Sequence, residues 1–162
     1  MLKSSFNAIA NDQTKIVILG SLPGDKSLEE KQYYAHPTNQ FWRLISGVIE
    51  EDLTRYAYRD RLDALLAARI GLWDVIASAS RVGSLDSQIR NPANNRLDLL
   101  QKGLPNLKCI AFNGQKSAKV ARKLLHSTSN FSLIDLPSSS AGYCSVTLEW
   151  KQHQWNQLKR HL

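Results

Sequence analysis

A stretch of amide and aromatic side chains, QYYAHPTNQFW at residues 32–42, has the composition of a site for a flat, polar ligand. A helix that begins at Pro37 or Thr38 places Asn39 in its first turn, beside backbone donors and the positive end of the helix dipole. A carboxamide at such a point can donate a hydrogen bond to one ligand atom and accept one from another. Asn39 is therefore a candidate functional residue.

Four aromatic residues in the same stretch divide into two pairs. Tyr33 and Tyr34 precede the expected helix and could stack on a flat ligand, although either could instead be a packing residue. Phe41 and Trp42 lie within the helix, at positions that are expected to face the hydrophobic core.

The segment Gly20–Asp25 (GSLPGD) follows an apolar run and could form a cradle for an anion or a base. Two glycines and a proline let the backbone turn tightly and bring its N–H groups close to a ligand, which makes Ser21, Leu22 and Gly24 candidate contacts. The segment lacks the glycine pattern of a dinucleotide site and the Lys-Ser/Thr pair of a nucleotide P-loop. An ordinary strand-to-helix turn is the alternative interpretation.

Two charged residues accompany the next apolar run. Asp74 is a polar residue within LWDVI, so its carboxylate needs a partner. A structural helix cap fits this position as well as base recognition does. Arg81 could hold a phosphate group, and a solvated surface arginine is the alternative.

Three consecutive serines, Ser138, Ser139 and Ser140, come directly after the last apolar run and Pro137. Small hydroxylated residues suit a close approach to a nucleic-acid backbone or minor groove, and a flexible polar turn is the alternative. None of them lies in the Gly-x-Ser-x-Gly elbow of a hydrolase.

Four apolar runs are predicted to be the strands that position these residues: Lys15–Gly20, Leu72–Ile76, Leu107–Phe112 and Phe131–Leu136. Helical periodicity is present in the segments Asn39–Glu50, Arg59–Ile70, Asn95–Lys102, Gln115–Leu125 and Leu148–Leu162. Gly71 is expected to cap the second of these helices, and Ser27 with Glu30 could form a capping box for a further short helix.

Strands that alternate with helices predict an α/β fold, a three-layer α/β/α sandwich around a mainly parallel four-stranded sheet. Residues 1–162 are expected to form a single domain. Ligands of such sheets bind at the carboxyl ends of the strands. The candidate loops follow predicted strands, so we expect them to meet at that edge.

The composition favours a polyanionic partner such as DNA. Lys and Arg number 21 against 14 Asp and Glu, a net charge of +7, and phosphate contacts to such residues release counterions. No apolar run approaches the ~20 residues that span a bilayer, and we recognise no secretory signal, so we expect a cytoplasmic protein without membrane contact. The two cysteines and four histidines form no disulfide or metal-ligand pattern, so we expect no metal and no cofactor.

Taken in order, the motifs resemble those of the uracil-DNA glycosylase superfamily, and its hypoxanthine-DNA glycosylase branch most closely. The resemblance covers nearly the whole chain and rests on five segments: GSLPG at Gly20–Gly24, YAHPTNQFW at Tyr34–Trp42, the WDV and GSLDSQIRNP stretches within 71–92, FNGQ at Phe112–Gln115 and LPSSS at Leu136–Ser140.

The chain departs from the wider superfamily at both main motifs. Leu22 stands where many relatives carry an acidic residue or an asparagine that positions water, and Leu136 stands where the second motif of uracil enzymes begins with histidine. The hypoxanthine branch is similar in both respects and is thought to use a later asparagine, which by position is Asn39. That branch continues the second motif with proline, whereas Ala141 follows the serines here.

The resemblance implies a monofunctional DNA glycosylase that hydrolyses the N-glycosidic bond of a flipped, deaminated base, with hypoxanthine as the first candidate. The substrate would be double- or single-stranded DNA, and the enzyme would act as a monomer. Asn39 would be catalytic, orienting water or contacting the departing base, and Tyr34 would stack on that base. The implied base contacts are Ser21, Leu22, Gly24, Asp74 and Asn113, and the implied DNA contacts are Ser138, Ser139, Ser140 and Arg81.

Three alternatives remain open. The same fold could excise uracil or another deaminated base, including one removed only from mismatches. A catalytically silent module that binds lesions is a second class, against which the retained Asn39 argues. A small α/β enzyme that acts on free nucleotides is the third, and salt-sensitive binding to duplex DNA would count against it.

Overall fold

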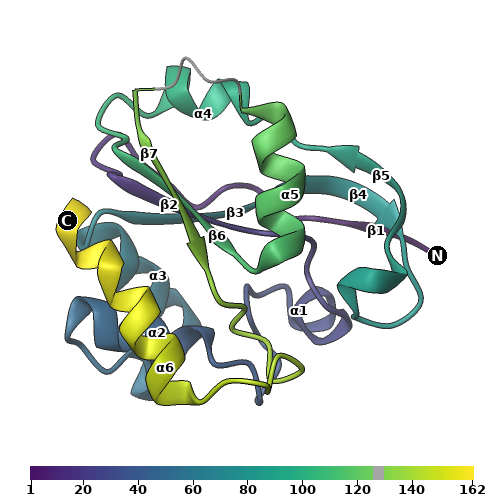
Figure 1. Ribbon diagram of the computed structural model, residues 1–162, viewed down its shortest axis with the longest axis horizontal. Helices are drawn as coiled ribbons and strands as arrows, with labels where there is room; N and C mark the ends of the chain where they lie inside the picture. The colour runs from purple at the N-terminus through teal and green to yellow at the C-terminus, as the bar shows by residue number, and fades with distance from the viewer. Residues whose placement is uncertain (126–129) are drawn as a thin grey trace.

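In the computed structural model, which describes residues 1–125 and 130–162, a four-stranded parallel sheet forms the centre of the protein (Figure 1). Its strands, in spatial order, are β3 (Ile70–Asp74), β2 (Ile16–Gly20), β6 (Cys109–Asn113) and β7 (Ser132–Leu136). All five residues of β2 are buried, because the strand pairs on both sides and is covered on both faces. The predicted α/β fold with a parallel four-stranded sheet is confirmed.

Alternate residues of β2 divide the core into two layers. Ile16 and Ile18 pack with the helices α2 (Phe41–Ile49), α3 (Tyr58–Ala67) and α6 (Leu148–Trp155). Val17 and Leu19 face the opposite side, towards α4 (Asp98–Gly103) and α5 (Gln115–Leu124). Successive side chains of a strand point to opposite faces of its sheet, so an entirely apolar strand builds a core on each face. Figure 1 shows α2, α3 and α6 grouped together, apart from α4 and α5.

A second, three-stranded antiparallel sheet was not anticipated from the sequence. Its strands, in spatial order, are β1 (Leu2–Ser4), β4 (Ile76–Ser80) and β5 (Arg90–Asn94). β5 is exposed along its whole length and has the polar sequence RNPAN, so it carries no apolar periodicity. The predicted strand Leu72–Ile76 is wrong in its bounds, because β3 ends at Asp74 and Ile76 already belongs to β4.

Two predicted helix caps are wrong. The helix predicted to run to Ile70 ends at Ala67, and Arg69 rather than Gly71 takes the left-handed conformation, with φ 65°. Gly71 lies inside β3, where an added Cβ would be only 2.7 Å from the carbonyl oxygen of Ile9. The need for glycine there comes from a neighbouring chain segment, which the local sequence does not reveal.

The capping box expected at Ser27 is also absent. Gly24 is the N-cap of α1 (Asp25–Glu30), and Ser27 lies within this helix and is buried. The Ser27 hydroxyl instead accepts a hydrogen bond from the backbone N–H of Ala35, which ties the start of the QYYAHPTNQFW stretch to α1. The last predicted helix continues beyond α6 only as a 3-10 helix, Asn156–His161.

No helix among the described residues is long and apolar enough to cross a membrane. His126, one of the four histidines considered in the sequence, lies outside the described residues.

Candidate active site

The carboxyl ends of β2, β3 and β6 and the loops that follow the strands enclose a cleft with a volume of about 560 Å³. All but one of the residues expected at the site line it: Ser21, Leu22, Gly24, Tyr34, Asn39, Asp74, Asn113, Ser138, Ser139 and Ser140. The exception is Arg81. Parallel strands bring their carboxyl ends to one edge, so segments more than 100 residues apart in the chain meet here.

Asn39 has a fixed orientation at the side of this cleft. It lies two residues before α2, which begins at Phe41 with Gln40 as N-cap, so the prediction that Asn39 occupies the first helical turn is wrong. The Asn39 Oδ1 atom accepts hydrogen bonds from the backbone N–H of Phe41, at 2.9 Å, and from the hydroxyl of Ser139, at 2.8 Å. A backbone N–H can only donate, so the amide oxygen must face it, and the Nδ2 group is the part of the carboxamide left for a ligand.

Ser139 connects Asn39 to the end of β6. Its hydroxyl donates to Asn39 Oδ1 and accepts from Asn113 Nδ2 at 2.8 Å, while its backbone N–H donates to Asn113 Oδ1 at 2.8 Å. The backbone N–H of Gln40 donates to the Ser139 carbonyl at 2.9 Å. Ser139 is 1% exposed, so the predicted DNA contact at this serine is corrected to an internal role that positions Asn39.

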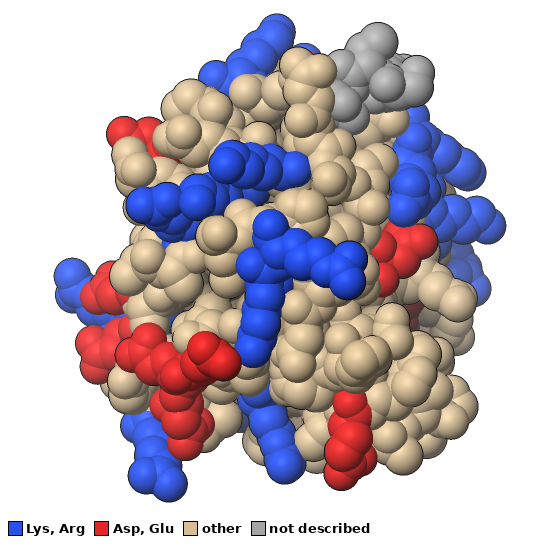
Figure 2. Space-filling view, turned by 60° about the vertical axis from the view of Figure 1, so that its left-hand side comes forward, with Lys and Arg blue, Asp and Glu red and all other residues tan. Residues whose placement is uncertain are grey.

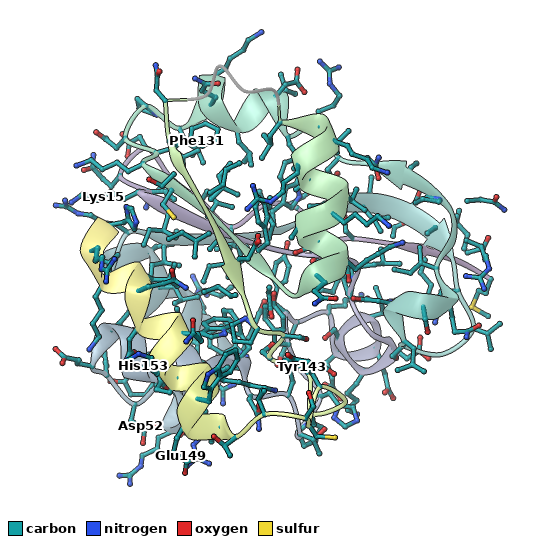
Figure 3. The ribbon with its side chains drawn as sticks, viewed as in Figure 1. Lys15, Asp52, Phe131, Tyr143, Glu149 and His153 are labelled. Carbon is teal, nitrogen blue, oxygen red and sulfur yellow. The ribbon has the colours of Figure 1, made fainter. Side chains whose placement is uncertain are left out.

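A buried lysine, which the sequence did not reveal as functional, connects the segment that carries Asn39 with the segment that carries Ser139. Lys151 of α6 is 1% exposed, and its Nζ donates to Gln40 Oε1 at 2.9 Å and to the Ser140 carbonyl at 3.2 Å. The ammonium lies 5.2 Å from the ring centroid of Tyr143, which is on the loop between β7 and α6 (Figure 3). Desolvation by burial lowers the pKa of Lys151.

Two buried polar groups, the Asp74 carboxylate and the Tyr34 hydroxyl, lie close to Gly20 at the bottom of the cleft. A Cβ added to Gly20 would lie 2.6 Å from Asp74 Oδ1 and 3.1 Å from the Tyr34 hydroxyl, so only glycine fits between them. Among the described residues no hydrogen-bond partner reaches Asp74 Oδ2 or the Tyr34 hydroxyl. Desolvation by burial, followed by the nearby charge of Asp86, raises the pKa of Asp74 to about 7. Asp74 is the last residue of β3 and is the N-cap of none of the described helices, so the helix-cap alternative for it is wrong.

The two tyrosines differ in their surroundings. Tyr33 is 3% exposed, and its hydroxyl donates to the Asn7 carbonyl at 3.1 Å, so it is mainly a packing residue. Tyr34 has a positive φ of 55°, and one face of its ring stacks on Phe41 with centroids 3.9 Å apart. Burial raises the pKa of the Tyr34 hydroxyl, which keeps it protonated as a hydrogen-bond donor. Phe41 and Trp42 lie in the core, as predicted.

Arg81 supports the Gly20–Asp25 loop from inside the protein. The residue is 2% exposed, and its guanidinium donates to the carbonyl oxygens of Leu22, Pro23 and Gly83. Its donors are therefore turned towards the backbone, and the predicted phosphate contact is corrected to a structural role. A different charged residue, Asp86, lines the cleft and accepts a hydrogen bond from the Ser21 hydroxyl at 2.6 Å.

The surface charge suits a polyanion. Figure 2 shows Lys and Arg side chains spread across one face of the molecule, with most of the acidic atoms in its lower half. The net charge of the chain is +7. Among residues 1–125 and 130–162, no group of three or more His, Cys, Asp or Glu side chains could hold a metal ion.

Comparison with known proteins identifies the family. A model of the uracil DNA glycosylase superfamily matches residues 8–159. Two curated relatives, each named hypoxanthine DNA glycosylase, are similar over almost their whole length. The protein from Methanosarcina barkeri is 40% identical, with 90% of this chain and 98% of the relative covered. The protein from Methanosarcina acetivorans is 39% identical, with 99% and 100% covered.

A solution NMR structure supports the same conclusion. It is of a Methanosarcina acetivorans protein provisionally described as a uracil DNA glycosylase, and it superposes with a TM-score of 0.88 at 38% identity. The match covers 99% of this chain and 98% of the other. The strand order, the cleft at the carboxyl ends and the full-length matches together place this chain in the uracil DNA glycosylase superfamily.

Proposed function

We propose that this chain is a monofunctional DNA glycosylase that hydrolyses the N-glycosidic bond of hypoxanthine in DNA. The names of both curated relatives support hypoxanthine as the base. The observation that carries the assignment of Asn39 as catalytic residue is its hydrogen bonding: Oδ1 is held by Phe41 and Ser139, and Nδ2 remains available at the cleft.

Extrusion of the damaged nucleotide brings its base into the cleft, and a deaminated, mispaired base is extruded at lower cost. When the glycosidic bond breaks, its electron pair leaves with the base, the sugar becomes positively charged at C1′, and water adds to C1′ and releases a proton. Because both lone pairs of Asn39 Oδ1 are already used, Asn39 acts as a donor. Its Nδ2 stabilises the negative charge that develops on the departing base.

The remaining contacts follow from the cleft geometry. Tyr34 lines the cleft, and the face of its ring opposite Phe41 stacks on the base. Ser21, Leu22, Gly24 and Asp74 line the wall against which the base edge lies. Asn113 shares its amide with Ser139 but keeps one N–H and one lone pair for the base.

Ser138 and Ser140 are the serines available to the DNA backbone, since Ser138 is half-buried and Ser140 is exposed. We expect the enzyme to act as a monomer on single- or double-stranded DNA in the cytoplasm, and size-exclusion chromatography with light scattering tests the monomer.

The test of the catalytic step compares Asn39→Ala with Asn39→Asp. Both remove the Nδ2 donor, but Asp retains an acceptor of the same size that could position water. We expect both variants to lose single-turnover excision by about 10²–10³-fold, with duplex affinity nearly unchanged. Excision by Asn39→Asp at the wild-type rate would show that Asn39 orients water through an acceptor. Equal losses of duplex affinity and excision in Asn39→Ala would contradict the assignment of Asn39 as the catalytic residue.

The base is tested with labelled duplexes that carry hypoxanthine, uracil, xanthine or a normal base, followed by alkaline cleavage of abasic sites. Strand cleavage at hypoxanthine supports the proposal. Cleavage at uracil alone would move the chain to another branch, and DNA binding without cleavage of any duplex would make it a silent lesion-binding module.

A further inference from the structure

A second cleft, with a volume of about 650 Å³, lies on the other side of the segment that carries Asn39. The described residues that line it include two arginines, one histidine and several amide or hydroxyl side chains, and none of them is acidic. Its lining residues are Gln32, Tyr34, Ala35, His36, Pro37, Thr38, Asn39, Gln40, Trp42, Arg43, Thr54 and Arg61. The active-site cleft, by contrast, includes Asp74 and Asp86. The second cleft therefore has the chemistry of an anion site.

Arg61 is held in place at this cleft. Its Nε donates to the Tyr56 carbonyl at 3.0 Å and its Nη2 to the Thr54 carbonyl at 3.1 Å. The guanidinium carbon lies 5.2 Å from the centroid of the Trp42 ring. Neutral carbonyls and an aromatic ring fix this arginine without adding a negative charge beside it, and less side-chain entropy is lost when an anion binds to it.

Arg43 adds a second positive charge. It is exposed on the first turn of α2, where the helix dipole also favours an anion. In the part of the chain that the structure describes, neither Arg43 nor Arg61 has a carboxylate partner within 4.0 Å. Because no described carboxylate neutralises these charges, they remain available to a phosphate group.

Tyr34, His36, Thr38 and Asn39 line both clefts and form the wall between them. A DNA strand that lies across the first cleft can continue over this wall to the second, before a nucleotide is extruded as well as after. We propose that the second cleft binds a backbone phosphodiester of the substrate DNA, with Arg43 and Arg61 as its ligands. This inference rests on the proposed function, since it needs DNA at the first cleft.

The test measures how salt weakens binding to an undamaged duplex. Fluorescence anisotropy gives the Kd of wild type and Arg43→Gln between 50 and 200 mM salt. Each phosphate contact contributes a slope of about −0.9 in log K against log salt, so Arg43→Gln should reduce the slope by about that amount. Arg160→Gln is the matched control, because Arg160 is exposed near the C-terminus and lines neither cleft.

Arg61→Gln serves as a second variant, and thermal unfolding first checks that it folds, since Arg61 also holds two carbonyl groups. An Arg43→Gln slope equal to that of Arg160→Gln overturns the proposal. The proposal also fails if Arg43→Gln weakens only the binding of deoxyinosine monophosphate, because the cleft then serves free nucleotides. The slope is measured on a duplex without a damaged base, so a failure to excise hypoxanthine in the separate cleavage assay would refute the proposed function without altering this slope.

Discussion

Ser139→Ala tests whether the hydrogen bonds behind Asn39 hold it in position for excision. The substitution removes two hydrogen bonds of 2.8 Å, one to Asn39 Oδ1 and one from Asn113 Nδ2. Each contributes about 1 kcal/mol net, and the half-buried Asn113 amide loses a partner, so we expect a decrease of about 2–3 kcal/mol in the free energy of unfolding. Asn39 then keeps only the Phe41 N–H at its oxygen, and its amide can rotate.

The effect on catalysis should exceed the effect on binding. A displacement of about 1 Å in a catalytic group can lower the rate about 10²-fold, so we expect Ser139→Ala to reduce single-turnover excision of hypoxanthine by about 10- to 100-fold. Because Ser139 is buried, duplex affinity should change little.

Ser117→Ala is the matched control for Ser139→Ala. Ser117 is also fully buried, and its hydroxyl donates to the Gly114 carbonyl at 3.3 Å, but it does not line the cleft. We expect Ser117→Ala to lower the free energy of unfolding by about 1 kcal/mol and to leave the excision rate unchanged. Urea unfolding and single-turnover kinetics at saturating enzyme measure both effects. A folded Ser139→Ala protein that excises at the wild-type rate would refute the role of Ser139 in positioning Asn39.

Two further predictions concern the floor of the cleft. The pKa of Asp74 rises from its ordinary 3.8 to about 7 on folding, so the folded state binds the extra proton, and stability should fall by about 4 kcal/mol as pH rises from about 4 to 7 and then level off. Asp74→Asn should abolish this pH dependence of the free energy of unfolding, and urea unfolding of both proteins at pH 4.5 and pH 8 measures it. An equal change in the free energy of unfolding between the two pH values in both proteins would contradict a raised pKa at Asp74. Gly20→Ala places a methyl group 2.6 Å from Asp74 Oδ1, so we expect a loss of about 1–3 kcal/mol and of most excision activity. At Gly103 an added Cβ would have no described atom within 4 Å apart from its chain neighbours and its own helix backbone, so Gly103→Ala should be neutral or stabilising. Equal effects in these two variants would refute the packing argument.

The sequence determined the central architecture, because the decisive elements carry strong local signals. The run IVILG of β2 is short and apolar at every position, which is typical of a strand covered on both faces. Strands that alternate with amphipathic helices then predict a parallel sheet, and the candidate loops follow its carboxyl edge. The second sheet escaped detection because β5 is polar and exposed, and it forms only by pairing with β4.

Within the site, the types and order of the residues identified which segments converge. Only the tertiary structure showed what each side chain contacts. Ser138, Ser139 and Ser140 are indistinguishable in sequence, yet Ser139 alone points inward to Asn39. Arg81 resembles any surface arginine until its guanidinium is found buried against the carbonyl groups of the Gly20–Asp25 loop.

Lys151 gives no sequence signal at all, since a lysine on a C-terminal helix is ordinarily solvated. Local sequence fixes periodicity and turn chemistry, which depend on neighbours along the chain. The direction of a polar side chain depends on the hydrogen-bond partners that other segments supply, and those partners exist only once the chain has folded.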